Sequence, residues 1–171
     1  MPLSQTTLFL ADESATARLG AAFAHAIEHA RASIATRGLV IGLSGDLGAG
    51  KTSLVRAMLR ALGVTGPVKS PTFALLEPYT VSSLDFYHFD FYRFTDPQEF
   101  DAAGFRELFG PGAVCAIEWP ERAGELPTPD LALTLSVEDV GRRVHLSAHS
   151  ELGVACLNEA ITRWKQTAAA G

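Results

Sequence analysis

A glycine-rich stretch in the first third of the chain has the residue types and spacing of a phosphate-binding loop. It reads Gly45-Asp46-Leu47-Gly48-Ala49-Gly50-Lys51-Thr52 and matches the P-loop pattern G-x-x-x-x-G-K-[ST]. Its glycines allow positive φ angles, so successive backbone N–H groups can point at an anion, and the next helix adds the positive end of its dipole. The stretch therefore predicts a nucleoside triphosphate site in which Lys51 reaches the β- and γ-phosphates and Thr52 offers its hydroxyl to Mg²⁺.

The sequence on either side of this stretch supports the prediction, because a P-loop joins a buried strand to a helix. Leu39 to Ser44 is an apolar run without polar alternation, typical of a parallel strand buried on both faces. A helix is predicted downstream with a stop at Gly63, since apolar residues recur there at helical spacing: Leu54, Val55, Met58, Leu59 and Leu62. A plain glycine turn with an exposed lysine is the alternative, and it has no use for the Lys51-Thr52 pair.

An acid that holds Mg²⁺ is expected at the carboxyl end of a buried strand beside the P-loop strand, and two residues fit. Glu118 ends the apolar run Val114 to Ile117, although a solvated strand terminus would look the same. Asp90 lies in an aromatic strand, where a carboxylate needs a partner such as a metal or a cation. By the two-residue period it shares a face with His88 and Tyr92. The role of His88 stays open between a structural and a functional one.

A second polar segment, Lys69-Ser70-Pro71-Thr72-Phe73, carries a hydroxyl on either side of a proline. Many P-loop proteins sense the γ-phosphate with a segment in this place, so Thr72 is a candidate for the catalytic machinery. Arg93 and the pair Arg142-Arg143 are candidates to supply positive charge to a transferring phosphoryl group, although a surface location is the commoner one for arginine. Trp119 follows Glu118 and packs either near the nucleotide or against the sheet.

Composition limits the class of protein. The chain has 171 residues, 47% of them apolar and 19% charged, which fits one domain over residues 1–171 with a frayed tail from about residue 166. A net charge of −5 and a pI near 5.5 argue against a protein that grips tRNA or DNA by itself. Cys115 and Cys156 lack metal-site spacing and are expected to be buried thiols. With no signal peptide or membrane span predicted, we expect a cytoplasmic protein.

The remaining elements are predicted from periodicity and turn residues. A first strand at residues 7–10 precedes a helix capped by Asp12 or Ser14. Two strands are expected at residues 73–76 and 86–92, joined by a turn around residues 80–83. A helix over 98–109, a strand over 113–117, a hairpin of residues 131–135 and 144–147, and a final helix follow.

Taken together, the segments GDLGAGKTS, VKSPTF, EPY, YHFDFYR and IEWPER, in this order and at these separations, closely resemble the TsaE (YjeE) family. That family is a bacterial ATPase needed for threonylcarbamoyladenosine in tRNA. The resemblance runs motif by motif from about Asp12 to Arg122, and beyond Arg122 it rests only on the size and order of the elements.

The resemblance implies a single α/β P-loop domain around a mixed β-sheet flanked by helices. It also implies ATP and Mg²⁺ as cofactors, with the metal held by Thr52, Glu118 and the further motif acid Asp90. The switch-like segment would be Ser70 to Phe73. Nucleotide contacts would fall on the loop from Gly45 to Ser53 and on Glu13, Trp119 and Arg142.

The family also implies partners. ATP hydrolysis would serve a complex with TsaD and TsaB, which transfer threonylcarbamoyl from its adenylate to N6 of the adenosine next to the anticodon. The chain itself would not perform that transfer and would meet tRNA only indirectly, with no role for DNA or a membrane.

Two other functions would use the same P-loop. A small-molecule kinase normally needs an acceptor pocket with a general base and a mobile, arginine-bearing lid, and no arginine-rich insertion of that kind is visible. A nucleotide-gated binding module would turn over negligibly without partners. A GTPase is disfavoured, because the guanine-reading motif N-K-x-D is absent from the sequence.

Overall fold

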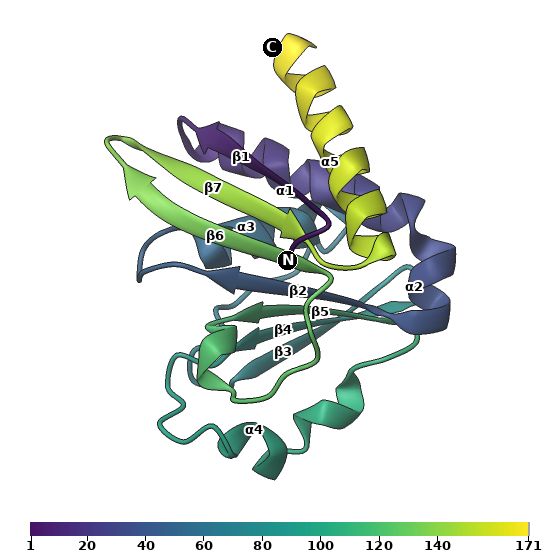
Figure 1. Ribbon diagram of the computed structural model, residues 1–171, viewed down its shortest axis with the longest axis vertical. Helices are drawn as coiled ribbons and strands as arrows, with labels where there is room; N and C mark the ends of the chain where they lie inside the picture. The colour runs from purple at the N-terminus through teal and green to yellow at the C-terminus, as the bar shows by residue number, and fades with distance from the viewer. Residues whose placement is uncertain (171) are drawn as a thin grey trace.

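Seven strands form one mixed sheet in the computed structural model, which describes residues 1–170 (Figure 1). The strands are β1 (Ser4–Leu10), β2 (Leu39–Ser44), β3 (Leu76–Val81), β4 (Leu84–Asp90), β5 (Ala113–Glu118), β6 (Leu131–Glu138) and β7 (Gly141–Ala148). They lie in the order β1-β7-β6-β2-β5-β4-β3. The neighbours β6, β2, β5 and β4 pair in parallel, whereas β1, β7 and β3 pair antiparallel with their neighbours. The predicted α/β domain with a mixed sheet is confirmed.

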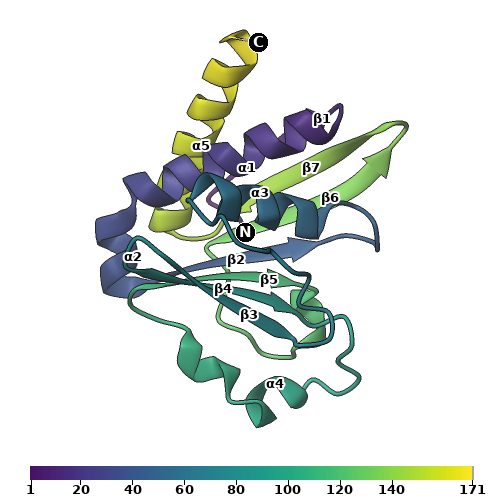
Figure 2. The same cartoon turned by 180° about the vertical axis from the view of Figure 1, so that it is seen from behind.

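Helices flank this sheet on both faces (Figures 1 and 2). They are α1 (Glu13–His29), α2 (Arg31–Arg37), α3 (Lys51–Ala61), α4 (Glu99–Ala102) and α5 (Glu151–Ala170). Helix α1 packs against α3 and α5, and a Cβ at Gly20 would lie only 2.3 Å from Cβ of Ala57, so a glycine is needed where α1 meets α3. Within residues 1–170, we found no helix whose length and apolar character would suit a membrane crossing.

The sheet separates two apolar clusters, and this division decides where the polar residues of β4 and β5 point. On one face, residues such as Leu43 and Val114 pack with α1 and α3. On the other face, Phe89 and Phe91 join an aromatic cluster with Phe100 of α4. Because side chains alternate along a strand, His88 and Asp90 of β4 and Glu118 of β5 lie on the face covered by α3.

One expected strand was placed wrongly. Residues 73–75 form a turn, in which Leu75 has a positive φ of 68°, and β3 begins only at Leu76. Pro78 lies inside β3, and this is compatible with a sheet because β3 is the edge strand, where a missing N–H donor breaks no ladder on the open side. The turn to β4 falls at Ser82 and Ser83, within the predicted range.

The expected helix over residues 98–109 is also wrong as a single element. Helix α4 spans only Glu99–Ala102, and a 3-10 turn follows at Phe105–Leu108. Gly104 between them has a φ of 75°, which ends the α-helical path. The last helix, α5, extends to Ala170; the fraying expected from about residue 166 concerns motion and stays a prediction.

Two further local predictions are confirmed. Asp12, rather than Ser14, caps α1, because its carboxylate accepts the N–H of Ala15 at 2.9 Å. Cys115 and Cys156 are buried free thiols. Burial raises the pKa of each thiol to about 12, which leaves both in the unreactive protonated form at neutral pH.

Candidate functional site

The glycine-rich loop predicted to bind phosphate lies between β2 and α3 with the backbone conformation that its glycines allow. Gly45, Gly48 and Gly50 have φ angles of 140°, 81° and 106°. A Cβ at Gly45 would lie 2.3 Å from the carbonyl oxygen of Leu135, and one at Gly50 would lie 2.7 Å from Nε of Arg142, whereas Gly48 faces open space. Side chains are therefore excluded where the loop meets its neighbours, and the loop backbone stays accessible at Gly48.

Lys51, the first residue of α3, folds back over the loop that precedes it. Its side chain is buried, and Nζ donates to the carbonyl oxygens of Gly45 and, at 3.0 Å, of Asp46. The same ammonium lies 4.4 Å from the centre of the Trp119 ring. Burial lowers the pKa of Lys51 below its ordinary value, an effect that the nearby carboxylates of Glu118 and Asp90 oppose. The Lys51 ammonium thus lies beside the open loop.

Thr52 and Glu118 form the contact that joins α3 to β5. The Thr52 hydroxyl lies 2.9 Å from Oε1 and 2.8 Å from Oε2 of Glu118. Asp90 is the register partner of Glu118 on β4, so the two buried carboxylates lie side by side at one edge of the sheet. The sequence predicts that both acids lie on strands beside the P-loop strand. This is confirmed for Glu118, because β5 pairs with β2, but it is wrong for Asp90, because β4 pairs with β5 and lies one strand further from β2.

Asp90 is held by one neighbour that follows β4 and one that precedes β3. Its Oδ1 accepts the backbone N–H of Tyr92 at 2.9 Å, and its Oδ2 accepts the hydroxyl of Thr72 at 3.3 Å. Burial raises the pKa of Asp90 above its ordinary value, partly offset by the Tyr92 hydrogen bond. Tyr92 lies beyond the end of β4, so the prediction that it shares a face of that strand with His88 and Asp90 is wrong.

His88 is the third polar side chain on this face of the sheet. It is completely buried, and Nε2 lies 2.6 Å from Oε2 of Glu118. Its Nδ1 is also buried and has no hydrogen-bond partner within residues 1–170.

The segment from Ser70 to Thr72 closes one side of the site. The two hydroxyls of Ser70 and Thr72 lie 2.8 Å apart, and Thr72 reaches Asp90 as described above. Next to them, the exposed ring of Phe73 lies 4.2 Å from the guanidinium of Arg93. The switch-like segment that the sequence indicated therefore connects the acid cluster to the surface.

These groups line one cleft of ≈ 280 Å³, formed by Leu47, Gly48, Gly50, Lys51, Thr52, Ser53, Ser70, Thr72, Asp90, Glu118, Trp119 and Arg142. Three residues of the predicted loop, Gly45, Asp46 and Ala49, do not line it, and Ala49 is buried. Of the three arginines considered from the sequence, Arg142 borders the cleft, whereas Arg143 pairs with Glu138 and Arg93 stacks on Phe73.

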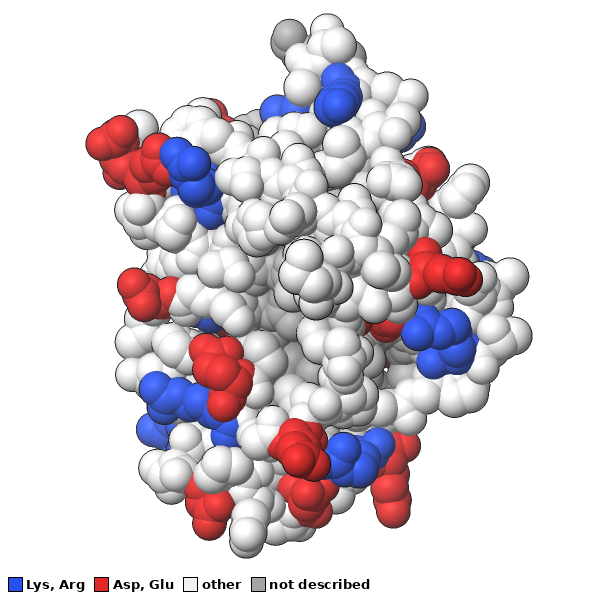
Figure 3. Space-filling model, viewed as in Figure 1, with Lys and Arg blue, Asp and Glu red and all other residues white. Residues whose placement is uncertain are grey.

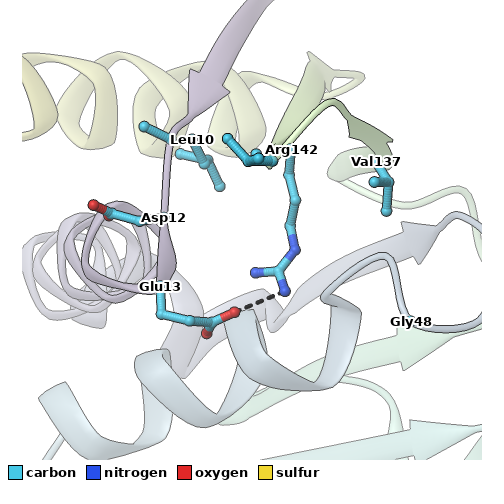
Figure 4. Close-up of a pocket in the computed structure, with 9 residues that line it drawn as sticks. Leu10, Asp12, Glu13, Gly48, Val137 and Arg142 are labelled. Atoms are coloured by element: carbon cyan, nitrogen blue, oxygen red, sulfur yellow. Dashed lines mark hydrogen bonds and ion pairs between the residues drawn. The ribbon is translucent and has the colours of Figure 1, made fainter.

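Arg142 also borders a second, larger hollow beyond the loop (Figure 4). Its guanidinium donates to Glu13 at 2.7 Å and to Thr16 at 3.1 Å, which ties β7 to the start of α1. The hollow has a volume of ≈ 560 Å³ and is lined by Leu10, Ala11, Asp12, Glu13, Gly48, Val137, Val140, Gly141 and Arg142.

Most residues of this second hollow were missed from the sequence. Leu10 and Val137 are ordinary apolar residues near the ends of β1 and β6, and Val140 lies in the turn between β6 and β7, so nothing in their type or spacing marks them. They meet because β1 pairs antiparallel with β7 and so joins the hairpin of β6 and β7, which is distant from β1 in the sequence. The apolar walls and the ion pair of Arg142 with Glu13 would suit a bound molecule with a flat, partly polar ring.

The oxygen donors at the loop fit a magnesium ion. Mg²⁺ takes oxygen ligands and binds to one or two carboxylates together with substrate phosphates, and Thr52, Glu118 and Asp90 offer a hydroxyl and two carboxylates in one cleft. Among the described residues there is no group of three or more His, Cys, Asp and Glu side chains that would hold a metal without help. A metal here would depend on phosphate oxygens and water as well.

Comparison with known proteins agrees with the geometry. The profile of the family described as "Threonylcarbamoyl adenosine biosynthesis protein TsaE" matches residues 10–144. A "tRNA threonylcarbamoyladenosine biosynthesis protein TsaE" from Haemophilus influenzae is 38% identical over 152 residues, which is 88% of this chain and 94% of that protein. A protein of the same name from Nostoc sp. is 38% identical and covers 81% of this chain and 82% of its own length.

A solved structure agrees as well. The crystal structure of YdiB from Bacillus subtilis superposes with a TM-score of 0.73 at 26% identity and covers 93% of this chain and 95% of its own.

The burial of Asp90 leads to a prediction about stability. Because burial raises the pKa of this carboxyl, its ionised form is disfavoured in the folded protein, and stability falls as the pH rises past the ordinary pKa of 3.8. Asp90→Asn keeps the acceptor for Tyr92 and removes the charge. We expect it to raise the free energy of unfolding in urea at pH 7, with a smaller gain at pH 5.

The matched control is Asp85→Asn, since Asp85 lies on the same strand with an exposed side chain. It should change little at either pH. A lower stability of Asp90→Asn at pH 7, or a gain that does not depend on pH, would contradict the account of a charge strained by burial.

Proposed function

This chain belongs to the TsaE family, and from that premise we propose that it binds ATP with Mg²⁺, hydrolyses ATP slowly alone, and supports the threonylcarbamoylation of tRNA through partner proteins. The observation that carries the proposal is the single cleft in which the open loop at Gly48 meets Lys51, Thr52 and Glu118. These are the groups that a bound nucleoside triphosphate with its metal requires.

The phosphates would bind to the loop backbone and to Lys51. The accessible backbone around Gly48 and the N-terminus of α3 favour an anion. Lys51 now donates to two loop carbonyls, which are neutral acceptors, and it would exchange them for charged phosphate oxygens. A phosphate oxygen carries negative charge, so it adds a coulombic attraction to the ammonium that a neutral carbonyl does not supply, and this exchange is favourable.

Thr52 and Glu118 would hold Mg²⁺, and Asp90 would act as a second ligand or as the base that positions water. Bound Mg²⁺ would supply positive charge that offsets the negative charge of the phosphate oxygens. The raised pKa of Asp90 suits a residue that accepts a proton. Thr72, which donates to Asp90, would orient that carboxylate. A change in the ligands of Asp90 would then shift Thr72 and the adjoining residue Phe73.

The nucleoside would occupy the larger hollow beside the loop. It adjoins the phosphate cleft, because Gly48 and Arg142 border both. Leu10, Val137 and Val140 would enclose the base. Glu13 and Arg142 would contact the polar parts of the nucleotide, while Trp119 would stay near the phosphates beside Lys51.

The role in tRNA modification would be indirect. The relatives are named as proteins of threonylcarbamoyladenosine biosynthesis, yet this chain has a net charge of −5, and acidic and basic side chains alternate over the face in Figure 3. Binding to an RNA backbone normally needs a basic surface. We therefore propose that TsaD and TsaB hold the tRNA and transfer the threonylcarbamoyl group in the cytoplasm, while this chain regulates or resets their complex by ATP binding and hydrolysis.

The first prediction concerns Lys51. Lys51→Ala should abolish ATP hydrolysis, because it removes a charged donor whose contact to phosphate stabilises the bound state by roughly 1.5–3 kcal/mol and the transition state by more. Isothermal titration calorimetry should show ATP affinity about 10- to 150-fold weaker, the same energy expressed as a ratio.

Lys165→Ala is the control, since Lys165 is an exposed lysine of α5. It should bind and hydrolyse ATP as the wild type does. Unchanged turnover in Lys51→Ala would contradict the proposed phosphate site, and phosphate transferred to a metabolite instead of water would favour the small-molecule kinase.

A second prediction concerns the exposed Phe73. Its side chain is 80% exposed beside Arg93, on the segment that contacts Asp90 through Thr72. Aromatic residues and arginine are enriched at the centres of protein interfaces. Pull-down of TsaD and TsaB should be stronger with ATP than with ADP or without nucleotide, and Phe73→Ala should weaken it at least tenfold while ATP affinity stays unchanged.

Leu3→Ala is the matched control, because Leu3 is another exposed apolar residue, 63% accessible, outside both hollows. It should leave partner binding intact. Equal association of the wild type in all three nucleotide states would contradict the proposed coupling, and full binding by Phe73→Ala would exclude this residue as the contact.

A further inference from the structure

The buried His88 has no role in the function proposed so far. We propose that His88 is a positioning residue for Glu118: it donates Nε2–H to Oε2 and so holds the carboxylate where Thr52 and the metal meet it. This inference rests on the proposed function, because it assigns Glu118 to the metal.

The contact is short and shielded from water. Nε2 of His88 lies 2.6 Å from Oε2 of Glu118, and the two side chains are 0% and 3% exposed. A carboxylate accepts and does not donate, so the imidazole must carry its proton on Nε2. A hydrogen bond to an ionised group at this depth is stronger than an exposed one and restrains the carboxylate in one orientation.

The other ring nitrogen argues against a purely structural role. Nδ1 is buried and has no partner among the described atoms. A polar atom left unpaired in the interior costs free energy that an apolar side chain of similar size would avoid. The hydrogen bond that the ring makes within the described residues is the one through Nε2, and it is directed at Glu118.

The hydrogen bond from His88 makes the two carboxylate oxygens of Glu118 inequivalent. Oε2 accepts from His88, and the Thr52 hydroxyl lies 2.9 Å from Oε1 and 2.8 Å from Oε2; within residues 1–170, Oε1 has no other hydrogen-bond donor. Thr52 has one proton, so it can donate to only one of the two oxygens at a time. With His88 on Oε2, Oε1 remains available to a cation beside the Thr52 oxygen.

His88 also relieves the crowding of two acids. Asp90 and Glu118 are register partners and are both buried, so their carboxylates would repel one another and favour movement of Glu118 away from Asp90. A donor fixed on β4, two residues from Asp90, opposes that movement. Groups that orient a metal ligand in this way typically change metal affinity 10- to 100-fold when they are removed.

The test compares two variants of His88 by Mn²⁺ binding to the complex with ADP, followed by the EPR signal of free Mn²⁺. His88→Met keeps a similar volume without the donor and should weaken Mn²⁺ binding about 10- to 100-fold. His88→Gln can place its amide nitrogen near the position of Nε2 and should stay within about threefold of the wild type. ADP affinity without metal should be unchanged in both, since His88 does not line the nucleotide cleft.

Melting temperature separates positioning from loss of fold. If His88→Met is unfolded, His88→Asn takes its place, because its shorter amide cannot reach Glu118, and the same loss of Mn²⁺ affinity is expected. Equal Mn²⁺ affinity in the wild type and in the folded variant without the donor would overturn the inference, as would an equal loss in His88→Gln. Absence of Mn²⁺ binding in the wild-type ADP complex would instead contradict the proposed metal site itself.

Discussion

The parallel pairing of β5 with β2 on one side and β4 on the other governs where the charged groups of the site lie. Parallel strands end at the same edge of a sheet, so the loop after β2, Glu118 at the end of β5 and Asp90 at the end of β4 meet there. The two-residue period then turns Glu118, Asp90 and His88 to the face that α3 covers. Because Thr52 lies in the first turn of α3, its hydroxyl is already within hydrogen-bond distance of Glu118.

This arrangement concentrates buried polar groups that must satisfy one another. Lys51, His88, Asp90 and Glu118 are all at most 5% exposed, in a region otherwise enclosed by apolar clusters. Each has at least one partner nearby, from loop carbonyls for Lys51 to the Thr72 hydroxyl for Asp90. In the proposed function, phosphate, metal or water would replace some of these partners when a nucleotide binds.

The sequence predicted the parts of the site that depend on local pattern. The P-loop is contiguous, and Glu118 and Asp90 stand at the ends of recognisable strands, so their types and places could be inferred. What failed was not marked by residue types in the local sequence. The start of β3 was misplaced because the left-handed turn at Leu75 has no glycine to mark it. The hollow around Leu10 and Val137, and the contact of His88 with Glu118, follow from strand register, which no local pattern encodes.

The central claim is that Thr52 and Glu118 hold a magnesium ion at the phosphates of a nucleotide on this loop. A crystal structure of the chain with Mg²⁺ and a non-hydrolysable ATP analogue tests it most directly. We expect the triphosphate to lie on the loop around Gly48, with the metal on the Thr52 hydroxyl and with Glu118 and Asp90 in direct or water-bridged contact. A metal that lies beyond water-bridged reach of both carboxylates, or a triphosphate bound away from Lys51, would contradict the account.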